Sequence, residues 1–204
     1  EDPPLPRFPA TKGYQAEASV DARGTSHSIS EHIYGVVEMP LDKQKYYGIT
    51  MSRWGGNTTS RFNWKINADN GAADWFWKNR GGIIRDPIEA GFLKKLNDNS
   101  REGIGGYLTL PMLGKVAKDH HSYSYSRKKF GDQGAYEPGH PDVGNGKTID
   151  GRILTEADWR DTSLDVGPEF AADAVRVAVE KVGRSQRIWA LDNEPMLWHK
   201  THFD

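Results

Sequence analysis

A carboxylate follows the last short apolar run of the chain, and its surroundings suit acid–base chemistry. Asn193-Glu194-Pro195 comes directly after residues 187–191 (RIWAL). A carboxyl group at the end of a buried strand, in a cleft lined by apolar and aromatic groups, is desolvated, so its pKa rises. It can then protonate a glycosidic oxygen, while Asn193 orients a sugar hydroxyl. The competing interpretation is that Glu194 only caps a turn, because the tripeptide alone is a weak motif.

Seven tryptophans are the second group of residues with a chemical use. Flat indole rings stack on pyranose rings, and they lose little conformational entropy when they are fixed in a groove. Trp64, Trp75 and Trp198 stand in polar segments among Asn, Asp and His, so we predict that they line a carbohydrate groove. Trp189 lies inside an apolar run and is expected in the core. Trp54 fits either place.

Strands buried on both faces are expected to position these side chains. Such strands read as short apolar runs without clean alternation. The chain has four of them, at 33–37, 49–53, 106–110 and 187–191. Strands that alternate with helices form parallel sheets, in which polar groups at the carboxyl ends of the strands form the active face. Arg53 and Asn57 close the second run, as Asn193 and Glu194 close the fourth.

Helices and loops connect these runs. Helical spacing of apolar residues, with Pro in the first turn, predicts helices over 87–97 and 168–182, the second closed by Gly183. Residues 14–23 alternate and are predicted to form a strand with one solvated face. Residues 119–161 form a long polar stretch with little periodicity, which is typical of a functional or disordered loop.

Composition excludes several classes of protein. The chain has 204 residues, with 27 Lys and Arg against 28 Asp and Glu, and no long basic run, so nucleic acid is not an expected partner. No window approaches the roughly 18 continuous apolar residues of a membrane span. The absence of Cys excludes disulfides, thiolate nucleophiles and Cys-ligated zinc. The start of the sequence lacks the regions of a signal peptide, and we expect a bacterial protein that is secreted or displayed at the cell surface after removal of its export signal.

Four blocks in one order resemble glycoside hydrolase family 44. They are Arg53-Trp54-Gly55-Gly56-Asn57, Ser60-Arg61-Phe62-Asn63-Trp64, Ala73-Asp74-Trp75, and the run from Leu191 to Trp198 with Thr201, His202 and Asp204. The resemblance implies a retaining endo-β-1,4-glucanase or xyloglucanase with Glu194 as the acid/base. It also implies an α/β fold, a (β/α)8 TIM barrel with an attached β-sandwich. Residues 1–24 would then be an arm and a sandwich strand, and residues 25–204 the first half of the barrel.

The chain departs from the family at the second carboxylate. Retention requires two carboxyl groups about 5 to 5.5 Å apart. The family's nucleophile lies on a later barrel strand, so we expect a second polypeptide to supply it and to complete the barrel. The substrate would be a β-1,4-glucan or xyloglucan. The alternatives are a non-catalytic half barrel that binds β-glucan and an unrelated α/β protein with chance motif matches.

Metal chemistry has weak support in the sequence. His199 and His202 with Asp204 lack a well-spaced further ligand, and His202 is expected near Glu194 instead. No cofactor is required by the proposed chemistry. Five aspartates offer oxygen ligands for a structural calcium without the spacing of an EF-hand: Asp142, Asp150, Asp158, Asp161 and Asp165.

Overall fold

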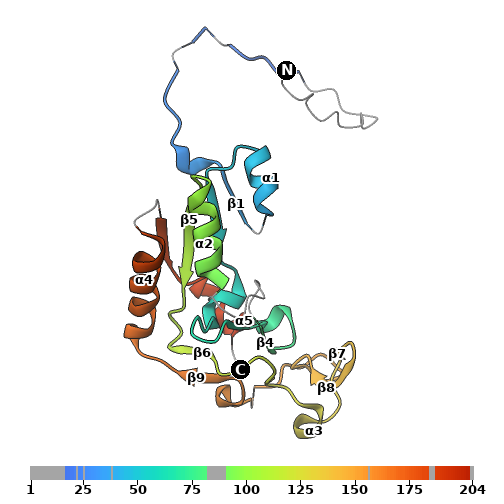
Figure 1. The fold of residues 1–204 in the computed structure, drawn as a ribbon. Helices are drawn as coiled ribbons and strands as arrows, with labels where there is room; N and C mark the ends of the chain where they lie inside the picture. The colour runs from blue at the N-terminus through green and yellow to red at the C-terminus, as the bar shows by residue number, and fades with distance from the viewer. Residues whose placement is uncertain are drawn as a thin grey trace.

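A parallel sheet of four strands forms the centre of the molecule (Figure 1). The computed structural model describes residues 17–202 except 22, 25, 38, 82–90, 156 and 184–186. The strands, in spatial order, are β1 (Gly35–Val37), β2 (Met51–Trp54), β5 (Gly105–Leu110) and β10 (Arg187–Leu191). Every neighbouring pair is parallel, so the four carboxyl ends lie at one edge of the sheet.

Two helices cover one face of this sheet. Helices α2 (Gly91–Arg101) and α4 (Pro168–Val182) lie side by side in Figure 1 and contact each other. Leu96 of α2, Ala178 of α4 and Leu108 of β5 belong to the principal core. All three are at most 2% exposed, so the helices and the sheet form one tightly packed layer pair.

The other face of the sheet is open. Val37, Arg53, Tyr107 and Ile188 lie side by side in register across the four strands. Val37 is 45% exposed and Ile188 is 39% exposed, and a hollow of about 510 Å³ lies over this row. Parallel sheets normally have both faces covered. Within the part of the chain that the structure describes, this face lacks such cover.

The strongest sequence patterns are confirmed closely. The predicted helix 168–182 and strand 187–191 coincide with α4 and β10, and Gly183 closes α4 with a φ of 72°. The strands predicted at 106–110 and 49–53 shift by one or two residues at their ends. Only part of 33–37 is a strand, because Glu31–Ile33 forms a 3-10 turn. A short helix, α1 (Leu41–Tyr46), joins β1 to β2.

Two other predictions need correction. Helix α2 continues to Arg101, beyond the predicted end at residue 97, and its predicted start at Pro87 lies outside the described residues. Residues 17–21, the described part of the strand predicted at 14–23 together with residue 23, are exposed and outside any strand. A strand needs a neighbour for its backbone N–H and C=O groups. No described strand pairs with this segment, so alternation alone did not make it a strand.

Smaller elements lie beyond the carboxyl edge of the sheet (Figure 1). They comprise three antiparallel pairs and two short helices: β3 (Ala68–Asn70) with β4 (Asn79–Gly81), β6 (Lys115–Ala117) with β9 (Ser163–Asp165), β7 (Tyr136–Glu137) with β8 (His140–Gly144), α3 (Arg127–Phe130) and α5 (Trp198–Thr201). The stretch 119–161, which we call the insertion, is therefore folded and not a bare loop.

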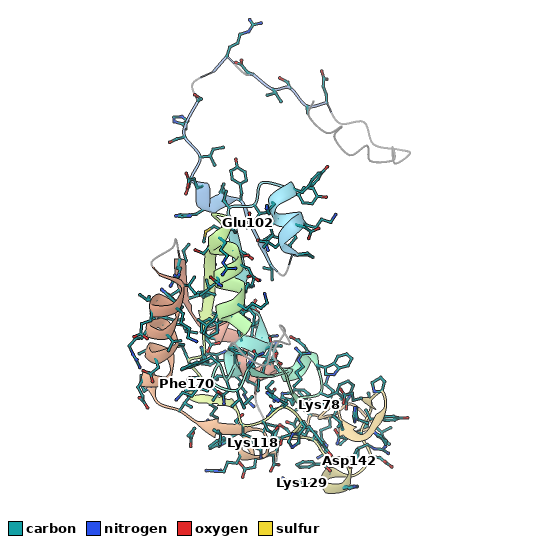
Figure 2. All side chains as sticks on the ribbon, viewed as in Figure 1. Lys78, Glu102, Lys118, Lys129, Asp142 and Phe170 are labelled. Atoms are coloured by element: carbon teal, nitrogen blue, oxygen red, sulfur yellow. The ribbon has the colours of Figure 1, made fainter. Side chains whose placement is uncertain are left out.

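The insertion has a small core of its own. Tyr125 and Leu154 pack there against Trp77, which comes from an earlier loop. Figure 2 shows Lys78 beside the insertion, with Asp142 and Lys129 inside it. The periodicity of the insertion could not predict this, because its central aromatic partner lies outside the segment.

Candidate active site

Asp192 anchors the end of β10. Its backbone N–H donates to the Leu110 carbonyl at 2.9 Å, which extends the strand pairing by one residue. Its buried carboxylate accepts hydrogen bonds from Ser60 Oγ at 2.5 Å, from the Met112 N–H at 2.6 Å and from the Asn193 N–H at 2.7 Å. Asp192 therefore ties together three segments that are distant in sequence and fixes the backbone before Glu194.

A relay of hydrogen bonds orients Asn193. Arg53 Nη2 donates to Asn193 Oδ1 at 2.6 Å, and Asn193 Nδ2 donates to Asn57 Oδ1 at 3.1 Å. Asn57 Nδ2 donates to Asp74 Oδ2 at 2.8 Å. The guanidinium only donates and the carboxylate only accepts, so both amides in between have one consistent orientation. The structure thus brings Arg53, Asn57 and Asn193 together through hydrogen bonds, and their part in binding a substrate stays a prediction.

Glu194 stands at the end of the relay on a strained backbone. Asn193 Nδ2 also donates to Glu194 Oε2 at 3.3 Å. Asp192 and Glu194 have φ values of 63° and 44°, in the left-handed region. For residues other than glycine this conformation costs about 1 to 3 kcal/mol, and such strain gathers at functional sites. The strain presents the carboxyl group clear of the strand.

The carboxyl group is not dry in this structure. Glu194 is exposed, whereas Asn193 beside it is buried. The expectation of a desolvated carboxyl is therefore wrong for the described residues. The physical reason is the open sheet face described above, since the helices α2 and α4 cover only the opposite face.

Two of the predicted tryptophans lie around this site. Trp198 is half-buried and its Nε1–H donates to the Asn193 carbonyl at 3.2 Å. Trp75 is 42% exposed and directly follows Asp74. Helix α5, which begins at Trp198, contacts the 3-10 turn Ala72–Asp74. The Trp198 ring is therefore hydrogen-bonded to the relay, whereas Trp75 adjoins it through the backbone that follows Asp74.

Trp64 has a different position. It packs against Phe170 of α4, with ring centroids 5.7 Å apart, and its Nε1–H donates to the Phe170 carbonyl at 3.2 Å. It lies against the principal core with Trp189, while Trp54 is fully part of that core. We therefore assign Trp64 a packing role, which corrects the prediction of a groove position.

His202 lies beneath the site and not on its surface. It is 7% exposed, and among the described residues no group forms a hydrogen bond of full geometry with its ring nitrogens. Burial and then the charge of Arg61 lower the pKa of His202 to about 3, while the nearby Asn57 backbone acts in the opposite direction. The ring is thus neutral at physiological pH, and it borders the backbone that carries the relay.

Neither a metal cluster nor a membrane span is found among the described residues. No group of three or more His, Asp or Glu there is arranged to hold a metal ion. Asp142 instead accepts hydrogen bonds from Tyr123 and Ser126, and Asp161 pairs with Lys129. No helix in the described ranges is both long and apolar enough to cross a bilayer.

Sequence reasoning gave no role to Asp192, Ser60 or Asp74. All three lie within the blocks that carry the resemblance, next to residues that were singled out. Their position next to those residues was the only hint in the sequence. Most of the residues to which they hydrogen-bond are distant in sequence and are brought close only by the fold.

Comparison with known families decides the classification. The family model of glycoside hydrolase family 44 matches residues 68–204. The chain belongs to glycoside hydrolase family 44. No match is found among curated proteins.

Solved structures agree with this membership. CelM2, a bifunctional glucanase-xylanase from a metagenome library, is 29% identical with a TM-score of 0.78, over 86% of this chain and 36% of CelM2. The Paenibacillus polymyxa family 44 xyloglucanase is 23% identical with a TM-score of 0.56, over 85% and 34% of the two chains. Cel44A, a Clostridium thermocellum endoglucanase, is 24% identical with a TM-score of 0.53, over the same shares. The family 44 chain described above spans about a third of the length of these enzymes.

Proposed function

We propose that this family 44 chain forms the first four β/α units of a (β/α)8 barrel that hydrolyses internal β-1,4-glucosidic bonds. The substrate class is cellulose-type glucan or xyloglucan. The observation that carries the proposal is the relay from Arg53 through Asn193 to Glu194, built at the carboxyl edge of a parallel sheet. Family membership and the glucanase-xylanase activity named for CelM2 support it. A secreted or cell-surface location fits a polymeric substrate.

Glu194 acts as the acid/base in this mechanism. Its protonated carboxyl gives a proton to the glycosidic oxygen as a second carboxylate attacks the anomeric carbon, and it later takes a proton from the water that releases the sugar. Asn193 hydrogen-bonds a sugar hydroxyl, and Arg53 holds the orientation of Asn193. The second carboxylate is supplied from outside the described residues.

The exposed sheet face is the place where the other half of the barrel fits. Its row of Val37, Arg53, Tyr107 and Ile188 faces the side away from α2 and α4. Further strands packed there would bury this row and shield Glu194 from bulk water. We propose that a second polypeptide provides these strands and the nucleophile.

The exchange Glu194→Gln in the complete protein tests the mechanism. It keeps the size of the side chain and removes the proton donor. We expect the rate of hydrolysis of a soluble β-glucan to fall about 10²- to 10⁴-fold, while the dissociation constant for cellohexaose, measured by calorimetry, stays similar.

The exposed Glu180 on α4 offers a matched control, because Glu180→Gln makes the same chemical change away from the site. Its rate should equal that of the wild type. Unchanged turnover in Glu194→Gln would rule out the acid/base role.

A non-catalytic half barrel is the second candidate, and the exposure of Glu194 favours it. Trp75 and Trp198 would then bind a glucan chain that is not cleaved. Binding of cellohexaose without release of reducing ends, by the complete protein with all its polypeptides, would support this function.

A further inference from the structure

The ring of Trp75 is held by a buried carboxylate from the insertion. Trp75 Nε1–H donates to Glu137 Oε1 at 2.8 Å, and Lys78 Nζ pairs with Glu137 Oε2 at 2.5 Å. Glu137 is only 7% exposed, whereas Trp75 is 42% exposed. A surface indole could satisfy its N–H with water. Because Glu137 accepts this hydrogen bond instead, it holds the indole ring in one orientation.

The carboxylate stays charged because of its partners. Burial alone would raise the pKa of Glu137, but the hydrogen bonds from Lys78 and Trp75, with the charge of Lys78, outweigh burial and lower it. A buried charge is costly unless it is paired and hydrogen-bonded. Both carboxylate oxygens are used here, one for the ion pair and one for the indole.

The backbone around Trp75 limits the position of the ring as well. A Cβ at Gly71 would approach the Trp75 carbonyl oxygen to 2.6 Å, so glycine permits a close contact there. Phe76 and Trp77, which follow, have left-handed φ values of 57° and 45°. The Phe76 ring meets the Trp75 ring edge-on, with centroids 5.5 Å apart. The close approach and the ring contact restrict where the Trp75 ring can lie.

The insertion is fastened to this loop and not merely near it. The Asn79 N–H donates to the Ser122 carbonyl at 2.7 Å, and Lys78 forms an isolated β-bridge with Tyr123. Lys78 lies beside the insertion in Figure 2. On the other side of Trp75, Asp74 accepts the hydrogen bond from Asn57. One loop therefore joins the insertion to the relay that leads to Glu194.

We propose that Glu137 is a positioning residue that holds Trp75 as a stacking platform for a pyranose ring, so that the insertion forms one wall of the substrate groove. This inference rests on the proposed function, because it requires a β-glucan chain to pass the relay. It gives the insertion a part in substrate binding that its polar, aperiodic sequence does not reveal.

Exchanges at both ends of the Glu137–Trp75 bond test the inference in the complete protein. Glu137→Leu removes the acceptor, and we expect the affinity for cellohexaose to fall about 2- to 12-fold, the range of an aromatic contact. Glu137→Gln keeps an acceptor oxygen and should retain most of the affinity. The loss should show as a higher KM with little change in kcat, because Trp75 binds substrate and transition state alike.

A double-mutant cycle separates positioning from a general structural role. In the Trp75→Phe background, which lacks the indole N–H, Glu137→Leu should cause no further loss of affinity. A purely structural Glu137 would lower affinity again in that background. Because Glu137→Leu leaves Lys78 unpaired, Lys78→Met/Glu137→Leu removes both charges together and repeats the measurement without an orphaned cation.

The outcomes distinguish the two levels of the proposal. If the wild type binds no β-glucan oligosaccharide, the proposed function itself fails. If the wild type binds and both Glu137→Leu and Lys78→Met/Glu137→Leu keep its affinity, the positioning role of Glu137 is overturned. Additive losses in the cycle overturn it as well.

Discussion

The site depends on which atoms can donate and which can accept. Arg53 at one end and Asp74 at the other leave the two amides between them one arrangement, so the orientation of the Asn193 side chain is fixed before any ligand binds. Such preorganisation lowers the cost of ordering the site on binding.

Acid should destabilise the protein through His202. Its pKa is lowered to about 3 by burial and by Arg61, whereas an unfolded histidine titrates near 6.5. Above pH 6.5 both states are neutral and the residue has no effect. As the pH falls from 6.5 toward 3, only the unfolded chain takes up the proton. The free energy of unfolding then falls by up to about 1.4 kcal/mol per pH unit.

Urea unfolding at pH 7 and pH 5 measures this effect. His202→Gln should reduce the loss of stability between the two pH values by about 2 kcal/mol. His121→Gln is the matched control, because the side chain of His121 is 84% exposed. Equal pH dependence in the wild type and His202→Gln would contradict the assignment.

The proximity of site residues can be predicted where the sheet itself brings them together. Arg53 lies near the end of β2, Asn57 and Asn193 come after β2 and β10, and parallel pairing places strand ends at one edge. Trp64 has the same kind of polar neighbours in sequence as Trp75. Its position is decided by Phe170, which is 106 residues away, and no local pattern contains that information.

At the scale of elements, prediction worked best for α4 and β10. Pro168 in the first turn, apolar residues at helical spacing and Gly183 at the end all agree, so the bounds of α4 follow from local physics. The sequence around the small strands β7 and β8 has no comparable set of local signals that agree with one another. They depend on the aromatic core around Trp77, Tyr125 and Leu154, which joins two separate segments.

The contact between α2 and β5 should be a large contributor to stability. Leu96 is 2% exposed, and Gly106 of β5 lets it approach, because a Cβ there would lie 2.6 Å from Leu96 Cδ2. Leu96→Ala leaves a cavity at this contact and should lower the free energy of unfolding by about 2 to 5 kcal/mol. Denaturant unfolding of the complete protein measures the change.

The exposed Glu102 near the end of α2 provides a comparison. It pairs with Lys45, whose side chain is 53% exposed, and surface pairs of this kind contribute roughly 0 to 1 kcal/mol. Glu102→Gln should therefore be nearly neutral. If Glu102→Gln lowered the free energy of unfolding as much as Leu96→Ala does, the contact of Leu96 with β5 would not be the larger contribution to stability.

On the scale of the whole molecule, helices cover only one face of the sheet in the part of the chain that the structure describes. Helices α2 and α4 cover one side. On the other side Val37 and Ile188, at the two ends of the row, are exposed, and Arg53 and Tyr107 between them are half-buried. Membership of family 44 and the roughly one-third share of the solved relatives agree with this picture. The sequence predicted the parallel sheet from its strand pattern, but only the structure shows which face lacks cover.

A charge on the open face should interfere with assembly. Ile188→Lys places an ammonium group at the β10 end of the row, where further barrel strands would have to bury it. If the proposed complementary polypeptide packs there, we expect less association with it in sedimentation experiments and a parallel loss of the proposed β-glucan hydrolysis.

Leu164→Lys makes the same exchange on β9, at a leucine that is 49% exposed and not part of the row. It should assemble normally. Full assembly and activity of Ile188→Lys would mean that the open face is not where the complement packs.

The left-handed conformation at Glu194 sets thermostability against chemistry at a single position. Glycine and asparagine accept a φ of 44° more readily than glutamate does, and an exposed side chain there contributes little to packing. A laboratory evolution campaign that rewards heat resistance alone would thus drift toward Gly or Asn at 194 and yield durable proteins without the proposed proton donor. Only a selection that scores sugar release in every round would retain the glutamate.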